Sequence, residues 1–168
     1  MLPGLPDSIG LLSQLSELDL GSNKFTRLPD GLKDLRQLTD LDLSNNKFKD
    51  LPEQLISLHQ LTSLDLSQNS LMSLPDTLTH LTRLRKLNLS SNQLTALPNS
   101  VTTLTQLTSL DLSHNKIKDL PESISSLTQL NRLNFSDNQL TTLPDCFREL
   151  IRITSLNLAN NQLADLPY

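Results

Sequence analysis

Aromatic residues and cysteine are scarce in this sequence of 168 residues. Aromatics make up 3% of the chain, as four phenylalanines, one tyrosine and no tryptophan. The phenylalanines fall at expected core positions, so we expect a surface without the aromatic anchors that usually dominate binding energy. The single cysteine, Cys146, excludes an internal disulfide. Because disulfides are typical of oxidising compartments, this composition favours a reducing one, and we expect a cytoplasmic location.

Long apolar runs and an excess of basic residues are also missing. No stretch of about 18 apolar residues is present, and the start of the chain has no charged and apolar regions of a signal peptide. We therefore expect no membrane association. The formal net charge of −4 lacks the basic excess that the phosphates of nucleic acid would require. A nucleic-acid partner is therefore not expected.

What the sequence does contain is a period of 23 residues, marked by one asparagine in each period. These asparagines are Asn23, Asn46, Asn69, Asn92, Asn115, Asn138 and Asn161. The segment 61–83 shows the surrounding frame, LxxLxLxxNxLxxLPxxLxxLxx. A fixed period of this length is the signature of a solenoid, in which each repeat is one structural unit.

This frame resembles the leucine-rich-repeat family over the whole chain, and its LP-containing second half is most similar to the intracellular Ras-group repeats of plants and animals and their bacterial relatives. The resemblance implies a right-handed α/β solenoid with a parallel sheet on the concave face and short 3₁₀ or α turns on the convex side. We expect one domain, 1–168, with a partial coil 1–14, six full repeats over 15–152, a partial coil 153–168 and no evident capping repeats. The implied function is protein–protein interaction within an intracellular signalling or effector protein.

The alternation within each repeat supports this fold independently. In Leu64-Asp65-Leu66 the leucines face one way and the aspartate the other, which predicts a short strand. Equivalent strands would stack in parallel about 4.8 Å apart. Seven apolar side chains per repeat point inward, and only neighbouring repeats can bury them.

Two polar features of the repeat have structural explanations. We expect each asparagine of the period to hydrogen-bond backbone groups of its own and the adjacent coil, forming an asparagine ladder. Each repeat also carries a proline followed in six of seven copies by Asp or Glu. Proline suits the first position of a helical turn and acids suit its N-terminus, so these acids need no functional role.

No catalytic, cofactor or metal motif is found, and we expect no enzymatic activity. The most suggestive set is Ser113, His114 and Asp137, in which His114 and Asp137 hold the same repeat position one coil apart. A catalytic triad also needs an oriented base and an oxyanion pocket, which a shallow sheet does not offer.

Four columns of residues are expected to point outward from the concave sheet. The first column is Glu17, Asp40, Ser63, Lys86, Ser109, Arg132 and Ser155. The second column is Asp19, Asp42, Asp65, Asn88, Asp111, Asn134 and Asn157. The third column is Gly21, Ser44, Ser67, Ser90, Ser113, Ser136 and Ala159. The fourth column is Ser22, Asn45, Gln68, Ser91, His114, Asp137 and Asn160.

Partner-binding residues should lie in these columns and next to them. The candidates are Glu17, Asp19, Asp40, Asp42, Asp65, Arg85, Lys86, Asn88, Asp111, His114, Arg132 and Asn134. Acids cluster on the first three strands and Arg85, Lys86 and Arg132 lie beyond them, so a protein or peptide with a basic end and a neutral or acidic end would match. The alternative is that these aspartates are only the residues most common at these positions of the repeat, without a role in binding.

The ends of the chain offer a second hypothesis. Solenoids usually close with polar capping repeats, whereas here the strand at 154–157, with Leu163 and Leu166 behind it, should present an open core and an unpaired edge. We expect either a segment of a longer protein or an end-to-end homodimer. A self-assembling or structural scaffold is therefore the alternative function.

Overall fold

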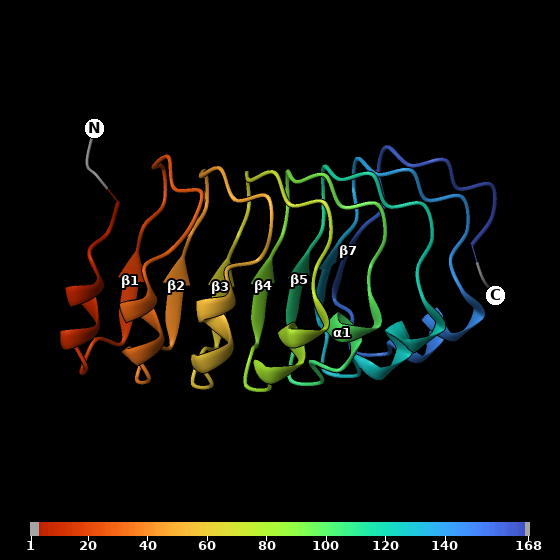
Figure 1. Ribbon diagram of the computed structural model, residues 1–168. Helices are drawn as coiled ribbons and strands as arrows, with labels where there is room; N and C mark the ends of the chain where they lie inside the picture. The colour runs from red at the N-terminus through yellow and green to blue at the C-terminus, as the bar shows by residue number, and fades with distance from the viewer. Residues whose placement is uncertain (1–3, 167–168) are drawn as a thin grey trace.

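A computed structural model describes residues 4–166 and contains one open sheet of seven parallel strands (Figure 1). Residues 1–3 and 167–168, at the outer ends of the two expected partial coils, lie outside the described residues. The strands follow one another in chain order. Their bounds are β1 Glu17–Asp19, β2 Asp40–Asp42, β3 Ser63–Asp65, β4 Lys86–Asn88, β5 Ser109–Asp111, β6 Arg132–Asn134 and β7 Ser155–Asn157. The predicted parallel solenoid is confirmed.

The N-terminal partial coil and each of the six full repeats carry one short helical turn away from the sheet, on the convex side (Figure 1). The 3₁₀ turns are η1 Asp7–Leu11, η2 Asp30–Asp34, η3 Glu53–Ser57, η4 Asp76–His80, η5 Glu122–Ser126 and η6 Asp145–Glu149, and the α-helical turn is α1 Asn99–Thr102. The prediction of short 3₁₀ or α turns is confirmed. None of the helical turns in the described residues has the length and apolar character needed to cross a membrane.

The repeat proline lies one position earlier than we expected. Pro29 is the N-cap of η2, with an extended backbone at φ −71° and ψ 154°. Its carbonyl accepts a hydrogen bond from the Leu32 N–H at 3.1 Å. An extended N-cap residue supplies the first carbonyl of a turn and need not donate, which proline satisfies. Asp30 is therefore the first residue of the turn, a place that favours its negative charge.

Backbone hydrogen bonds join neighbouring coils on both sides of every three-residue strand. Before β3, Thr62 N donates to Thr39 O at 2.8 Å, and after it Leu66 N donates to Asn88 O at 2.8 Å. The seven frame leucines of coil 61–83 fill the space behind the sheet. They are Leu61, Leu64, Leu66, Leu71, Leu74, Leu78 and Leu81, none more than 6% exposed. The outward columns therefore stand on a packed support.

The first two convex turns approach each other closely. A Cβ added at Gly31 in η2 would lie 1.8 Å from the carbonyl oxygen of Asp7 in η1. A Cβ at Gly10 would lie 2.6 Å from the carbonyl oxygen of Gly31. Both contacts are with backbone atoms, which cannot rotate away. These two glycines are therefore required by the spacing of the turns.

Candidate binding surface on the sheet

The structure places ten of the twelve candidate residues on strands β1 to β6. The other two lie beside the strands: Arg85 directly precedes β4, and His114 follows β5 by three residues. In the first column Glu17 pairs in register with Asp40, and Lys86 pairs with Ser109. In the second column Asp42 pairs with Asp65. Residues 23 positions apart thus become direct neighbours on one face.

The first column carries four exposed charges. Glu17, Asp40, Lys86 and Arg132 are exposed, whereas Ser63 and Ser109 between them are partly buried. Asp40 Oδ2 accepts a hydrogen bond from Thr39 Oγ1 at 2.8 Å. Within residues 4–166, no lysine or arginine makes an ion pair with a carboxylate. These charges are therefore available to a partner.

The second column has a structural role that the sequence reasoning missed. In all seven coils the side-chain Oδ1 accepts a hydrogen bond from the backbone N–H two residues later. Asp42 Oδ1 accepts from Ser44 N at 2.7 Å, and Asn88 Oδ1 accepts from Ser90 N at 3.1 Å. This is the turn that Asp and Asn form at the end of a strand. The signal was available, because this oxygen is the only polar side-chain atom that Asp and Asn share.

The remaining oxygen of the second-column aspartates is used unequally. Asn88 Nδ2 donates to Asp65 Oδ2 at 2.9 Å, and Asn134 Nδ2 donates to Asp111 Oδ2 at 3.1 Å. For Asp19 and Asp42, no hydrogen bond to Oδ2 from another residue in the range 4–166 is present. The acidic patch that can serve a partner is therefore concentrated on β1 and β2.

The third column is small in every coil, as the sequence indicated. Ser67, Ser113 and Ser136 are buried at 5–6% exposure. Ser113 Oγ donates to Asp111 Oδ1 at 2.7 Å. A partner backbone can approach the sheet along this column, because no side chain longer than serine stands in it.

The fourth column adopts the left-handed backbone conformation throughout, which the sequence reasoning did not foresee. Its seven non-glycine residues have φ between 50° and 56°. The column includes Asn45, Asp137 and Asn160, residue types that tolerate this region, but also Gln68 and His114. Because the column has no glycine and several residue types, its sequence pattern did not indicate a left-handed turn. Its side chains are held at the rim of the sheet by a fixed backbone.

The suggestive set Ser113, His114 and Asp137 is not arranged as a nucleophile and base. The Ser113 hydroxyl is bonded to Asp111, not to His114. His114 Nε2 lies 3.6 Å from Asp137 Oδ2, with the histidine side chain 60% exposed. Asn160 Nδ2 also donates to Asp137 Oδ1 at 2.8 Å. His114 and Asp137 therefore form a polar contact at the rim, and the Ser113 hydroxyl takes no part in it.

The asparagine ladder runs behind the surface and holds the coils in register. Asn115 Nδ2 donates to Leu89 O and Leu112 O, both at 3.0 Å, and to Ser113 O at 3.2 Å. Its Oδ1 accepts from Leu94 N at 3.0 Å. The same inter-coil pattern recurs from Asn46 to Asn161. The amide thus satisfies backbone groups that no strand pairing reaches.

Away from the sheet, the Cys146 thiol lies on the convex side, in the turn η6. Cys146 Sγ donates to Glu122 O at 3.0 Å, and partial burial together with Glu122 raises the pKa of the thiol.

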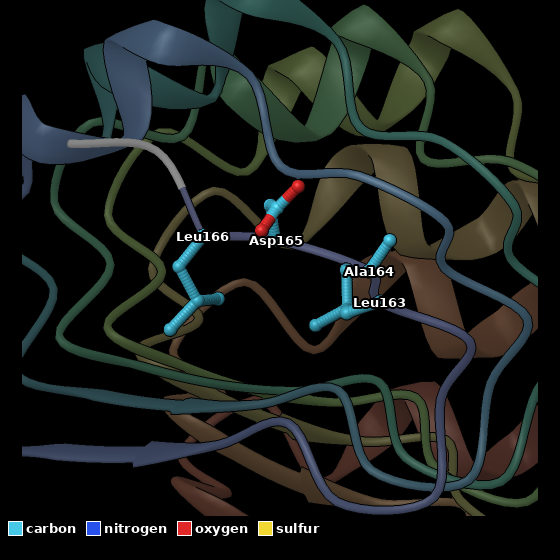
Figure 2. Close-up of a pocket in the computed structure, with 4 residues that line it drawn as sticks. All are labelled: Leu163, Ala164, Asp165 and Leu166. Carbon is cyan, nitrogen blue, oxygen red and sulfur yellow. The ribbon is translucent and has the colours of Figure 1, made fainter.

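A hollow of about 360 Å³ at the C-terminal end is lined by Leu163, Ala164, Asp165 and Leu166 (Figure 2). Among the described residues, no three His, Cys, Asp or Glu side chains form a group that could hold a metal ion.

Comparisons with known proteins agree with this geometry. A family model described as "Leucine-rich repeat region" matches residues 76–165, and one described as "Leucine rich repeat" matches residues 4–48 and 38–94. A search of curated proteins gave no match.

Several solved structures share the fold. A leucine-rich-repeat protein of Leptospira interrogans is 38% identical with a TM-score of 0.95, over 98% of this chain and 42% of that chain. The leucine-rich-repeat ectodomain of the plant membrane receptor kinase GASSHO1/SCHENGEN3 from Arabidopsis thaliana, solved in complex with CASPARIAN STRIP INTEGRITY FACTOR 2, is 35% identical with a TM-score of 0.85, over 95% and 20%. The functional domain of InlJ from Listeria monocytogenes is 34% identical with a TM-score of 0.80, over 94% and 32%. The chain therefore spans less than half the length of each of these proteins.

Proposed function

Because the chain belongs to the leucine-rich-repeat family, we propose that it is a non-enzymatic module that binds another protein or a peptide through the outward columns of its concave sheet. Leucine-rich-repeat domains generally mediate protein–protein interaction. The Arabidopsis relative, whose ectodomain was solved in complex with a partner, supports this partner class.

One observation carries the proposal: charged side chains are exposed on strands whose inward leucines pack against the core. Glu17, Asp40, Lys86 and Arg132 are exposed on their strands. Leu41, next to Asp40 on β2, is 3% exposed, and Leu87, next to Lys86 on β4, is 2% exposed. Because the backbone beneath these charges is already ordered, binding has to order only their side chains, and the order of charges favours orientation and association rate.

The acidic end of the surface can be tested without disturbing the fold. The second column already contains Asn in three coils, so Asp19→Asn and Asp42→Asn keep the Oδ1 acceptor and remove only the charge. Combined with Glu17→Gln and Asp40→Asn, they neutralise four acids on β1 and β2. Reversal of Asp65 to lysine is a poorer test, because it would also remove the bonds from Ser67 N and Asn88 Nδ2.

A convex variant provides the matched control. Asp30→Asn, Glu53→Gln, Asp76→Asn and Glu122→Gln change the net charge by the same amount at the first residues of convex turns. We expect the wild type and the convex variant to retain a protein captured from a lysate of the source organism, and the concave variant to lose it. Equal retention by all three proteins would contradict the assignment to the concave face.

We propose association through the ends as the second candidate function. It is supported by Leu156 on β7, which is 43% exposed, and by Leu166, which is 58% exposed and lines the hollow in Figure 2. Exposed apolar groups beside an unpaired strand edge favour association with another chain. Light scattering should then show an oligomer that Leu163→Lys dissociates while circular dichroism stays unchanged. A monomeric mass at all concentrations would count against this candidate.

We propose further that the module acts within an intracellular signalling or effector protein in the cytoplasm. The support is the LP-containing frame and the presence of one cysteine, Cys146, in the whole sequence. Fractionation of source cells with an antibody to the chain tests this location. Recovery from the culture medium or the outer surface would contradict it.

A further inference from the structure

We propose that the partner segment bound by the concave face is an extended peptide that crosses the strands and places one basic residue over β1 and β2 and acidic residues over β4 and β6. This inference rests on the proposed function and names the partner class for the same surface. It follows from the order of charges in the first column, their separation and the small residues beside them.

The charges of the first column change sign once along the sheet. Glu17 on β1 and Asp40 on β2 are acidic, and Lys86 on β4 and Arg132 on β6 are basic. The strand register places them in one row, with Ser63 and Ser109 as the spacers. All four charged side chains are exposed.

The protein does not neutralise these charges internally. The one ion pair within residues 4–166 joins His114 and Asp137. Asp40 and Lys86 stand two strands apart, about 10 Å at the usual strand spacing, and the backbone ladder holds that separation. Opposite charges kept apart on a rigid surface are complementary to a ligand with the reversed order of charges.

The spacing of the row defines the spacing of charges in the ligand. From the middle of β1 and β2 the row runs about 12 Å to β4 and about 22 Å to β6. An extended peptide rises about 3.3 Å per residue, and alternate side chains face the sheet. A basic residue at position i therefore matches acidic residues at about i+4 and i+6, in either chain direction.

The neighbouring columns suit an extended backbone better than a bulky surface. The third column contains only Gly, Ser and Ala, so a peptide main chain can lie close to the strands. The second column next to it presents carboxylate oxygens on β1 and β2, such as Asp42 Oδ2, that accept no hydrogen bond from another described residue. Recognition then depends on charge order and main-chain contact, consistent with a surface poor in aromatic residues.

Selection from a display library of random peptides of about twelve residues tests the inference. The wild type should enrich peptides in which one basic residue is followed or preceded by two acidic residues, about four and six positions away. The variant Glu17→Lys, Asp40→Lys, Lys86→Glu, Arg132→Glu has the same net charge and should enrich the reversed pattern. A synthetic peptide with a sequence enriched by the wild type should bind this variant on the order of tenfold more weakly than it binds the wild type. Added salt should reduce that ratio.

The outcomes separate this inference from the proposed function. Enriched peptides without the charge spacing, or one motif shared by both proteins, would overturn the inference and leave the concave face as a binding surface. Failure to enrich any peptide would overturn the extended-peptide partner, while the capture experiment still decides the proposed function. Circular dichroism of the charge-swapped variant confirms that an altered selection reflects charge and not unfolding.

Discussion

Coil 107–129 in the middle of the solenoid and the outer coils follow the same 23-residue frame, yet the same residue has a different environment in each. Leu110 on β5 is 1% exposed, whereas its equivalent Leu156 on β7 is 43% exposed. Asn115 is 8% exposed and therefore buried, whereas Asn23 near the N-terminal end is exposed. Each coil is packed against its neighbours, so the energetic role of a residue depends on its coil as well as on its identity.

The two ends also differ from each other. Asn161 in the last coil donates to Phe135 O, a bond into the preceding coil, and accepts from Leu140 N. In the part of the chain that the structure describes, Asn23 donates only within its own coil, to Leu20 O and Gly21 O. From Asn46 to Asn161, each ladder asparagine bonds the coil that precedes it, on its N-terminal side. The C-terminal coil therefore keeps its asparagine bonds, but its strand leucine is less buried than those of the middle coils.

The largest expected difference between coils concerns the strand leucines. Leu110→Ala removes side-chain atoms from a filled core and should lower the free energy of unfolding by about 3 kcal/mol. Leu156→Ala removes partly hydrated atoms and should lower it by about 1 kcal/mol or less. Urea unfolding of both variants measures the difference. Equal losses would show that the last coil is as well packed as the middle one.

The asparagine ladder should show a smaller but ordered series. Asn115→Ala leaves buried backbone groups, including Leu94 N, without a partner, so we expect a loss of about 2 kcal/mol. Asn161→Ala should cost less because its coil is more open, and Asn23→Ala should cost least, about 0.5 kcal/mol. Thermal unfolding of the three variants tests the order. A loss for Asn23→Ala as large as for Asn115→Ala would contradict the direction of the ladder.

Sequence reasoning placed the core correctly because leucine spacing depends only on periodicity, as Leu64 and Leu66 illustrate. It misjudged features that depend on backbone conformation. Pro29 is compatible with both the N-cap and the first turn residue, so the pattern did not separate them. The aspartates of the second column were treated as charges, whereas Asp42 and Asn88 share a hydrogen-bonding role that charge counting does not detect. The contact surface itself stays a prediction, since no partner defines it.

Glycine at the N-terminal end provides the next contrast. Gly31→Ala forces η2 away from the Asp7 carbonyl and should cost about 1.5 kcal/mol. For Gly21→Ala, on the concave side of the same coil, the three atoms nearest the added Cβ are side-chain oxygens of Asp19, Ser44 and Asp42 at 3.1–3.3 Å. These side chains can shift, so stability should change by less than about 0.5 kcal/mol. Chemical denaturation of both variants distinguishes the faces. A neutral Gly31→Ala would mean that the turns can separate freely.

The smallest expected effect concerns the left-handed fourth column in the middle of the sheet. Gln68 has a φ of 54° and an exposed side chain, so its main energetic feature is backbone strain. Asparagine tolerates this region better than glutamine, and Gln68→Asn should raise the free energy of unfolding by about 0.5 kcal/mol. Gln93→Asn is the control, because Gln93 is not among the positive-φ residues of the described chain. A gain confined to Gln68 would show that strain persists even where both neighbouring coils support the turn, whereas equal changes at both sites would assign the effect to the side chain.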